Sequence, residues 1–434
     1  MNTPIYDFVK NYSELNSVRL HMPGHKGNNF LGVENIDITE INGADSLYDA
    51  SGIIKESEEN ASKVFKSGAS FYSTEGSSHT IKAMIYAALL KRDKKDGKRP
   101  CICAVRNVHK SFIYACGLMD IDVNFIYPKK ADGLCGGCAT KEEIEKEIIN
   151  SEPFAVFVTS PNYLGEISDI RGISDVCKKY DIPLLVDNAH GAYLTKFDMH
   201  PINLGAAMCV DSAHKTLIAL TGGAYLHISN EYNDKYENVI KNAMSVFGST
   251  SPSYLTLASL DLCNKYLTEN DFSDTYKKVG ELKEYIKGLG FKLVGNEPFK
   301  ISVKLNGENA EKILRKNDIY CEYYDKSVVV LMFSNENNKN DFSKIKEVFK
   351  EIENDGENIK IKIPKGKRVM SIREALMSEY EEIDICDAKG LICKESSVSC
   401  PPAIPVAICG EIITDEIVNI CQFYGINKIS VVKE

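Results

Sequence analysis

Two strings, LLVDNAHG at Leu184–Gly191 and CVDSAHKTL at Cys209–Leu217, indicate the fold most clearly. Each stretch begins as a short apolar run and ends in polar residues, which is typical of a buried strand that runs into a loop. Polar residues at the carboxyl ends of parallel strands lie where open α/β sheets bind ligands. The spacing between Asp187 and Lys215 leaves room for one short crossover between neighbouring strands. We therefore expect both side chains at one edge of a parallel sheet.

Strands and helices alternate outward from this stretch. Continuous apolar strands separated by helices predict an α/β fold with a mainly parallel sheet that is covered on both faces. The predicted strands are CICAV at 101–105, residues 123–127, PFAVFVTS at 153–160 and AYLHIS at 224–229, and the predicted helices are 57–67, 79–92, 111–117, 141–150 and 173–180.

The pattern changes after residue 270. A polar helix is expected from Asp271 to Leu289, followed by a smaller α/β unit with hairpin-like strands. The proline cluster CPPAIP, Cys400–Pro405, excludes a central strand or a helix interior there. We expect an N-terminal arm over residues 1–50, a large domain over 51–270 and a small C-terminal α/β domain over 271–434.

Composition narrows the class of function. The 434 residues are too many for one small core, so two or more domains are expected. The net charge is −9 without a basic block, which argues against nucleic acid or an anionic membrane as the main partner. Apolar runs stay shorter than a bilayer needs, and the first residues lack a signal-peptide pattern. A cytoplasmic location is the expectation.

Two strand-end residues indicate chemistry. Lys215 lies between the apolar strings VDSA and LIALTGGAYL, where desolvation would lower its amine pKa and suit it to form a Schiff base. The alternative is a surface lysine on a strand-to-helix turn. Asp187 ends an apolar strand, where a carboxylate can hold a heterocyclic nitrogen protonated, as the ring of pyridoxal 5′-phosphate (PLP) requires. The alternative is a cap for the next helix.

Two further strings fit the same cofactor. TEGSSHT, Thr74–Thr80, places glycine and hydroxyls at the start of a predicted helix, which predicts an anion site suited to a phosphate. The alternative is an ordinary serine N-cap. His109, after the CICAV strand, is placed to lie over a ring bound at the sheet edge, or it is a polar loop histidine.

The cysteines give a weaker signal. Cys135 and Cys138 form CGGC in a glycine-rich loop, which fits a zinc half-site or a redox pair. A structural zinc site needs a second close pair of ligands, and none follows. We therefore expect two loop thiols and no metal centre.

These features follow one another along the chain as an anion loop, a histidine after a strand, a strand-end Asp and then Lys. The large domain of fold-type I PLP enzymes, the aspartate-aminotransferase-like fold, has the same order. The chain resembles the Orn/Lys/Arg decarboxylase family, in the short form without an N-terminal wing domain. The resemblance covers nearly the whole chain. It is carried in order by HMPGHKG at 21–27, SSHTIKAMI, RNVHKS, TSPNYLGEISDI, LLVDNAHGAY, SAHKTLIALT, SPSYLTLASLD at 251–261 and CPPAIPVAICGEIIT at 400–414.

The resemblance implies a set of site residues. Lys215 is the Schiff-base lysine, Asp187 pairs with the pyridinium nitrogen, and His109 stacks on the ring. Thr250 reaches the phosphate of a neighbouring subunit, and Glu411 faces the distal cation of the substrate. The remaining implied contacts are Ser77, Ser78, His79, His190, Ser212 and His214 for the cofactor, and His25 for the substrate.

Three positions and one string depart from the family pattern. The usual strand-end string is VDEAHGAHF, whereas this chain has Asn188 at the second acid and Tyr193 at the second histidine. Gly222 stands where the family often has Gln. The string GADSLYDAS at 43–51 replaces an acidic string that ends in His-Pro. These departures bear on substrate choice more than on the reaction.

The implied activity is decarboxylation of arginine, lysine or ornithine to agmatine or a diamine, the chemistry of polyamine biosynthesis, through a Schiff base exchanged at Lys215. A homodimer or larger homo-oligomer with sites at the subunit boundary is expected. Two alternatives stay open. One is a PLP aminotransferase or lyase, for which Arg315, Arg368 or Arg373 could hold the α-carboxylate. The other is a decarboxylase-like protein that only binds and regulates.

Overall fold

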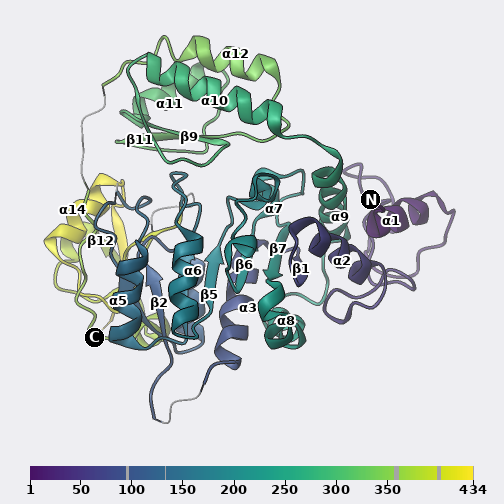
Figure 1. Cartoon of the computed structure of the whole chain (residues 1–434), viewed down its shortest axis with the longest axis horizontal. Helices are drawn as coiled ribbons and strands as arrows, with labels where there is room; N and C mark the ends of the chain where they lie inside the picture. The colour runs from purple at the N-terminus through teal and green to yellow at the C-terminus, as the bar shows by residue number, and fades with distance from the viewer. Residues whose placement is uncertain (94–96, 132, 356–360, 398–401, 434) are drawn as a thin grey trace. The chain divides into compact units, whose positions relative to one another are not determined.

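The structure, a computed structural model, describes residues 1–93, 97–131, 133–355, 361–397 and 402–433 (Figure 1). It divides into two compact units. Unit 1 comprises Met1–Lys95, Phe154–Phe157 and Ile170–Asp271, and unit 2 comprises Asp96–Pro153, Val158–Asp169 and Phe272–Glu434. Two residues of the proline cluster, Cys400 and Pro401, lie outside the described residues.

A seven-stranded sheet has the order β1-β7-β6-β5-β4-β2-β3. The pairs β5–β6 and β2–β3 are parallel, whereas β7 runs antiparallel to both β1 and β6. The expected mainly parallel sheet is confirmed. The reversed strand is β7, and its direction was not predicted because an apolar run does not show which way a strand runs. The strands are β1 Ala69–Ser73, β2 Cys101–Val105, β3 Asp122–Ile126, β4 Ala155–Thr159, β5 Leu184–Asp187, β6 Met208–Asp211 and β7 Ala224–Ile228.

Unit 1 surrounds its strands with helices. These are α1 Pro4–Glu14, α2 Ile53–Phe65, α3 Gly76–Leu90, α6 Ile170–Lys179, α7 Ala213–Thr216, α8 Asn233–Phe247 and α9 Tyr254–Glu269. Helix α2 begins four residues before the predicted start because Asp45, in the preceding loop, accepts hydrogen bonds from the N–H groups of Gly52 (2.8 Å) and Ile54 (3.0 Å). Across the described residues, every helix is too short or too polar to cross a bilayer.

Unit 2 contains two further sheets of four strands each, where one small α/β domain was predicted. The first has the order β10-β11-β9-β8 and the second β12-β15-β13-β14. Pro405 is the first residue of β14, which lies at the edge of its sheet, as the proline cluster requires. The strands are β8 Lys292–Val294, β9 Lys300–Lys304, β10 Tyr323–Asp325, β11 Val328–Met332, β12 Tyr380–Asp384, β13 Cys393–Ser397, β14 Pro405–Ala407 and β15 Lys428–Val432.

The helices of unit 2 agree with the sequence pattern where it made a prediction. The polar helix expected over 271–289 is α10, Ser273–Gly288, and the helix expected at 111–117 is α4, Lys110–Leu118. The others are α5 Lys141–Ser151, α11 Gly307–Lys316, α12 Lys339–Val348, α13 Ile372–Met377 and α14 Asp415–Phe423.

Arg106 directly follows β2 and binds the C-terminal segment within unit 2. Its side chain is 1% exposed, and its Nη1 and Nη2 donate to the carbonyls of Pro405 (3.0 Å) and Val406 (2.9 Å). The guanidinium also lies over the Phe125 ring, 5.5 Å from its centroid. Two parallel N–H donors in a fixed fork match two successive carbonyls, which a lysine ammonium does not do.

We therefore expect Arg106→Lys to lower the free energy of unfolding by roughly 1–3 kcal/mol, because at least one buried carbonyl loses its donor. Chemical denaturation of the full chain measures this. Arg99→Lys is the control, because Arg99 is an exposed arginine whose ion pairs lie at the surface, and its loss should stay within about 0.5 kcal/mol. Equal effects of the two changes would contradict the anchoring role of Arg106.

Candidate functional site

The ends of β5 and β6 lie side by side in unit 1. Asp187, the last residue of β5, pairs with Val210 of β6, and the N–H of Asn188 donates to the Val210 carbonyl at 2.9 Å. The Asp187 carboxylate is 3% exposed and accepts the N–H of Ala189 at 3.1 Å. Burial raises the pKa of Asp187, although the nearby Lys215 charge acts in the opposite direction. A carboxylate in this state favours a cationic N–H partner.

Lys215 lies in the short helix α7, directly after β6. Its Nζ is 3.0 Å from Nε2 of His190, and its charge acts on Asp187. The side chain is partly buried. The structure thus brings the predicted amine, carboxylate and His190 into one group, on the two strand ends where the sequence placed them.

The N-terminus of α3 carries the residues for which an anion site was predicted. Ser77 Oγ accepts the hydroxyl of Ser212 at 2.8 Å, which ties the helix start to the end of β6. The loop before the helix is held by the N–H of Gly76, which donates to the Gly222 carbonyl at 2.7 Å. Ser78 occupies the same first turn. Backbone N–H groups and hydroxyls at a helix start are of the kind that binds a phosphate.

Two predicted histidines of unit 1 have protein partners. His214 Nδ1 lies 2.9 Å from the Gly223 carbonyl, and burial lowers the pKa of its imidazole. His79 is buried, with Nδ1 2.7 Å from Ser73 Oγ and Nε2 2.8 Å from the Met244 carbonyl. Since both ring nitrogens of His79 contact the protein, this residue supports the α3 start from within the core.

The chemistry of this donor set fits PLP. The PLP aldehyde requires an amine, which Lys215 has, and the ring nitrogen requires an acid, which is the buried Asp187. The phosphate requires hydroxyls and a helix N-terminus, which are present at Ser77 and Ser212. Gly222 has a φ of +97°, and a side chain there would come within 2.5 Å of the Thr74 carbonyl. The close approach of the Gly222 and Thr74 loops beside the α3 start therefore requires a glycine.

His109 and Glu411 belong to unit 2. His109 is the N-cap of α4, and its Nδ1 accepts the N–H of Ser111 at 3.1 Å. Glu411 is 5% exposed, and its carboxylate accepts the N–H of Ile408 at 2.8 Å. A side chain at Gly366 would collide with that carboxylate, with 2.2 Å between the new Cβ and the carboxyl carbon. In this chain Glu411 is thus held in a tight turn of the C-terminal segment.

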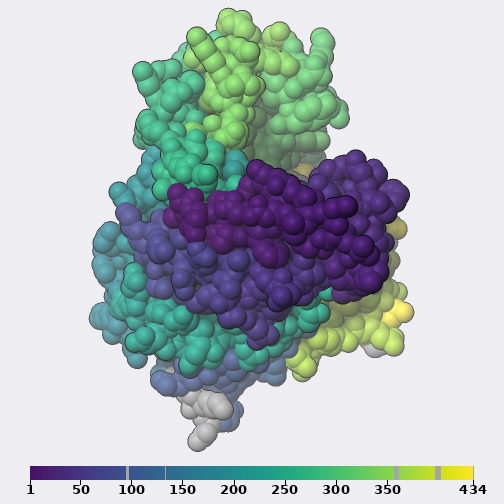
Figure 2. Space-filling view, turned by 90° about the vertical axis from the view of Figure 1, so that its right-hand side faces the viewer, coloured from purple at the N-terminus to yellow at the C-terminus, as the bar shows by residue number. Residues whose placement is uncertain are grey.

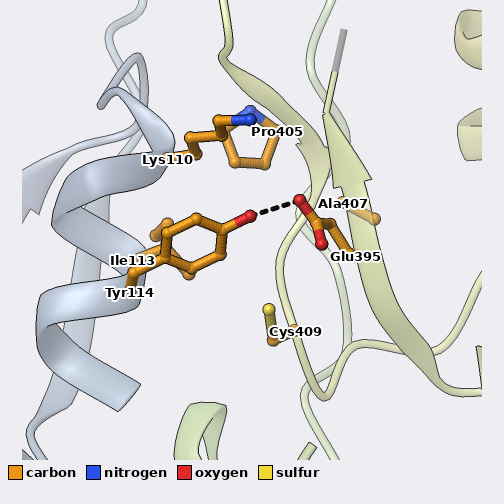
Figure 3. A pocket seen from close by; sticks show the side chains of 7 residues that line it. All are labelled: Lys110, Ile113, Tyr114, Glu395, Pro405, Ala407 and Cys409. Carbon is orange, nitrogen blue, oxygen red and sulfur yellow. Dashed lines mark hydrogen bonds between the residues drawn. The ribbon is translucent and has the colours of Figure 1, made fainter. Parts of the chain in front are cut away.

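A small pocket lies beside α4, within unit 2 (Figure 3). It is lined by Lys110, Ile113, Tyr114, Glu395, Pro405, Ala407 and Cys409. The Tyr114 hydroxyl donates to the Glu395 carboxylate across it, and burial followed by that carboxylate raises the pKa of Tyr114. Tyr114 and Glu395 form a polar wall of the pocket, and the other lining residues are mostly apolar.

The two remaining predicted residues lie in unit 1 and belong to loops. His25 is held in the N-terminal arm, with Nε2 3.2 Å from Asp37 and Nδ1 accepting the N–H of Gly27 at 3.0 Å. Thr250 is exposed in the turn between α8 and α9.

The sequence did not reveal a buried polar cluster next to the site. It consists of Asn188, His200, Asp211 and His227, all fully buried. Asp211 stands directly before Ser212 in the DSAHK string, which was a possible signal. His227 comes close only because β7 pairs with β6 antiparallel, and that register is not legible in the sequence.

Cys135 and Cys138, the CGGC pair, are free thiols. Burial raises the pKa of both thiols, so neither is a thiolate near neutral pH. The interpretation as two loop thiols is consistent with these surroundings.

Comparison with known proteins places this chain in a family. The model of the family "Orn/Lys/Arg decarboxylase, major domain" matches residues 3–289. An arginine decarboxylase of Bacillus subtilis is 30% identical over 458 residues, which cover 95% of this chain and 92% of that protein. An uncharacterized protein of the same organism is 28% identical over 461 residues, which cover 96% of this chain and 93% of that protein.

Solved structures agree in fold. The lysine decarboxylase of Francisella novicida superposes with a TM-score of 0.81 at 18% identity, over 99% of this chain and 81% of that one. The constitutive lysine decarboxylase of Escherichia coli gives a TM-score of 0.80 at 16% identity, over 100% and 82%. The expected fold-type I architecture is confirmed, and the chain belongs to the Orn/Lys/Arg decarboxylase family.

Proposed function

We propose that this protein carries PLP on Lys215 and decarboxylates a basic L-amino acid, arginine, lysine or ornithine. The observation that supports it most directly is the group of Lys215, Asp187 and the α3 start in unit 1, held by the bonds at Ala189 and between Ser77 and Ser212. Family membership supports decarboxylation, and the names of the relatives favour arginine or lysine. A cytoplasmic location belongs to the same proposal, because the described cysteines are free thiols, as is usual in a reducing compartment.

Each residue has a role in this proposal. Lys215 holds the cofactor and yields its place to the substrate amine, and Asp187 keeps a proton on the ring nitrogen. The α3 start with Ser77, Ser78, Ser212 and His214 holds the phosphate. PLP, when bound, withdraws into its ring the electron pair that the departing carboxylate leaves behind.

The later steps involve residues near Lys215, in unit 2 and in the N-terminal arm. Lys215 or a nearby histidine returns a proton to the α-carbon of the substrate. His109 stacks on the ring, His79 and His190 support its surroundings, and Glu411 with His25 contacts the basic substrate. A carboxylate opposite the distal cation selects basic substrates, since an unpaired buried charge costs several kcal/mol.

We expect purified protein with PLP to release CO2 from at least one of arginine, lysine and ornithine. We expect Lys215→Ala to lower kcat roughly 10³-fold or more, since the variant loses both the covalent anchor of the cofactor and a proton donor. Measuring CO2 across the three substrates tests both statements. Lys196→Ala is the matched control, since Lys196 is similarly buried and donates to the Leu267 carbonyl, away from the site.

Two outcomes would contradict the proposal. Keto-acid formation without CO2 would indicate an aminotransferase. Protein that takes up no PLP from solution would indicate a decarboxylase-like regulator.

Gly222→Ala should weaken PLP binding about tenfold or more, because the new side chain pushes the Thr74 loop away from the α3 start. Absorbance titration of cofactor-free protein with PLP measures the dissociation constant. Gly280→Ala, where a side chain meets open space within α10, should leave it unchanged. An unchanged dissociation constant for Gly222→Ala would show that this loop does not hold the phosphate.

We further propose a homodimer built on the N-terminal arm, in which Thr250 reaches the partner's site. Large apolar side chains of the arm are strongly exposed, among them Val18 (84%), Leu20 (90%), Phe30 (77%) and Leu31 (87%). Figure 2 shows the N-terminal residues, in dark purple, spread over the surface. Several large exposed apolar side chains on one arm are typical of an interface, and a second copy is the occupant that symmetry favours.

The double change Leu20→Glu and Leu31→Glu should therefore convert a dimer into monomers and abolish activity. Sedimentation velocity with parallel assays measures both properties. Tyr320→Glu is the control, because Tyr320 is 80% exposed but lies in unit 2. A fully active monomer would overturn the dimer proposal.

A further inference from the structure

Asp211, the last residue of β6, is the centre of the buried cluster beside the site. Its carboxylate accepts hydrogen bonds from Asn188 Nδ2 (2.6 Å), His200 Nε2 (2.9 Å) and His227 Nε2 (3.2 Å). Asn188, His200, Asp211 and His227 are all 0% exposed. Three donors on one buried carboxylate satisfy an ionised acid without help from water.

The strand register holds this cluster in place. His227 of β7 stands opposite Ser70 of β1 and opposite Cys209 of β6. Ser70 Oγ lies 2.8 Å from His227 Nδ1. Phe65 covers the imidazoles, with its ring centroid 4.3 Å from that of His227. The cluster is therefore fixed on three strands and shielded by an aromatic ring.

The hydrogen bonds define the protonation of the cluster. An ionised carboxylate only accepts, so His200 and His227 each present an N–H at Nε2. Burial alone would raise the pKa of Asp211, but the His200 and His227 imidazoles outweigh it and lower that pKa. Burial also lowers the pKa of His227. Asp211 thus stays ionised near neutral pH.

Asn188 connects this carboxylate to the site. It directly follows Asp187, and its own N–H is bonded to the Val210 carbonyl. Its amide fills the space beside Gly191, where a side chain would come within 2.1 Å of Asn188 Oδ1. Its orientation is therefore fixed by Asp211 on one side and by the Gly191 turn on the other.

Asp211 also adjoins the anion site. Ser212, the next residue, donates to Ser77 at the α3 start. The position of Asn188 is one where the resemblance led us to expect an acid, and in this chain the neighbouring carboxylate is provided by β6. The buried acid Asp211 is therefore linked to the turn after Asp187 through Asn188, and it directly precedes Ser212, which contacts the helix start.

We propose that Asp211, acting through Asn188, is a positioning residue that fixes the turn carrying Asp187 for its role toward the cofactor. This inference rests on the proposed function. Asp211 does not touch the ring in this account. It sets the direction of the Asp187 carboxylate by holding the amide of the next residue.

A metal site is the other use of these side chains. Ligand atoms of His200, Cys209 and Asp211 lie within 4.8 Å of one another. The hydrogen-bond account is favoured because each contact of Asp211 already joins a donor to an acceptor, and burial raises the pKa of the Cys209 thiol, which opposes a thiolate ligand.

The first experiment needs no cofactor. The Ala189 N–H donates to Asp187, so its hydrogen exchange, followed by NMR in cofactor-free full-length protein, reports on the Asp187 turn. We expect Asn188→Ala and Asp211→Ala each to speed this exchange about tenfold or more. The double variant should exchange no faster than Asp211→Ala, because both changes break the same link.

Asp211→Asn is the conservative variant. Asn188 Oδ1 has no hydrogen-bond partner among the described residues, so it can accept from the new amide after a flip. Exchange at Ala189 should then stay within about threefold of wild type. This variant also keeps the proposal testable if Asp211→Ala does not fold.

Asp261→Ala is the matched control. Asp261 is 0% exposed in the same unit and accepts bonds from Ile5 N–H (2.9 Å) and Ser57 Oγ (2.5 Å), away from the site. It should lower the unfolding temperature and leave Ala189 exchange unchanged.

The second experiment titrates the same variants with PLP. Asn188→Ala and Asp211→Ala should raise the dissociation constant about tenfold, with the same lack of additivity. Additive effects in either experiment, an equal effect of Asp261→Ala, or one equivalent of bound metal in the wild type would overturn the proposal. If the wild type binds no PLP, the proposed function fails, while the exchange result still decides whether Asp211 fixes the turn.

Discussion

The burial of the Asp187 carboxylate at the end of β5 is the constraint on which the site depends. An acid that is 3% exposed has a raised pKa and needs a cationic neighbour to stay ionised. The chain surrounds it with Lys215 on the adjoining strand end and with a rigid turn at Ala189. Because β5 and β6 are parallel neighbours, both polar ends meet at one edge, and the α3 start is tied to that edge through Ser212.

Much of this site could be predicted from the sequence because its residues follow short apolar strands. Asp187 and Lys215 end such runs, and Ser77 opens a helix after a glycine, so local pattern alone placed them. The structure confirmed the strands and their mainly parallel pairing. The order of motifs along the chain then identified the family, which no single motif could do.

The rest depended on contacts between distant segments. The reversed direction of β7 brings His227 to Asp211, which the sequence pattern does not show. Asp45 extends α2 from the preceding loop, and this cap depends on how the loop folds back onto the helix start. The sequence pattern assigned no role to Arg106, whose guanidinium is buried against the carbonyls of β14. The number of sheets in the C-terminal part was also not predicted, because hairpin-like strands do not reveal which of them share a sheet.

The proposed function depends most on Lys215 as the lysine that carries the cofactor. Borohydride reduction of the protein with PLP, followed by peptide mass mapping, locates the lysine to which the pyridoxyl group is fixed. The account predicts one label per chain, on the peptide that contains Lys215. A label on another lysine, or no label on protein that is folded and saturated with PLP, would contradict it.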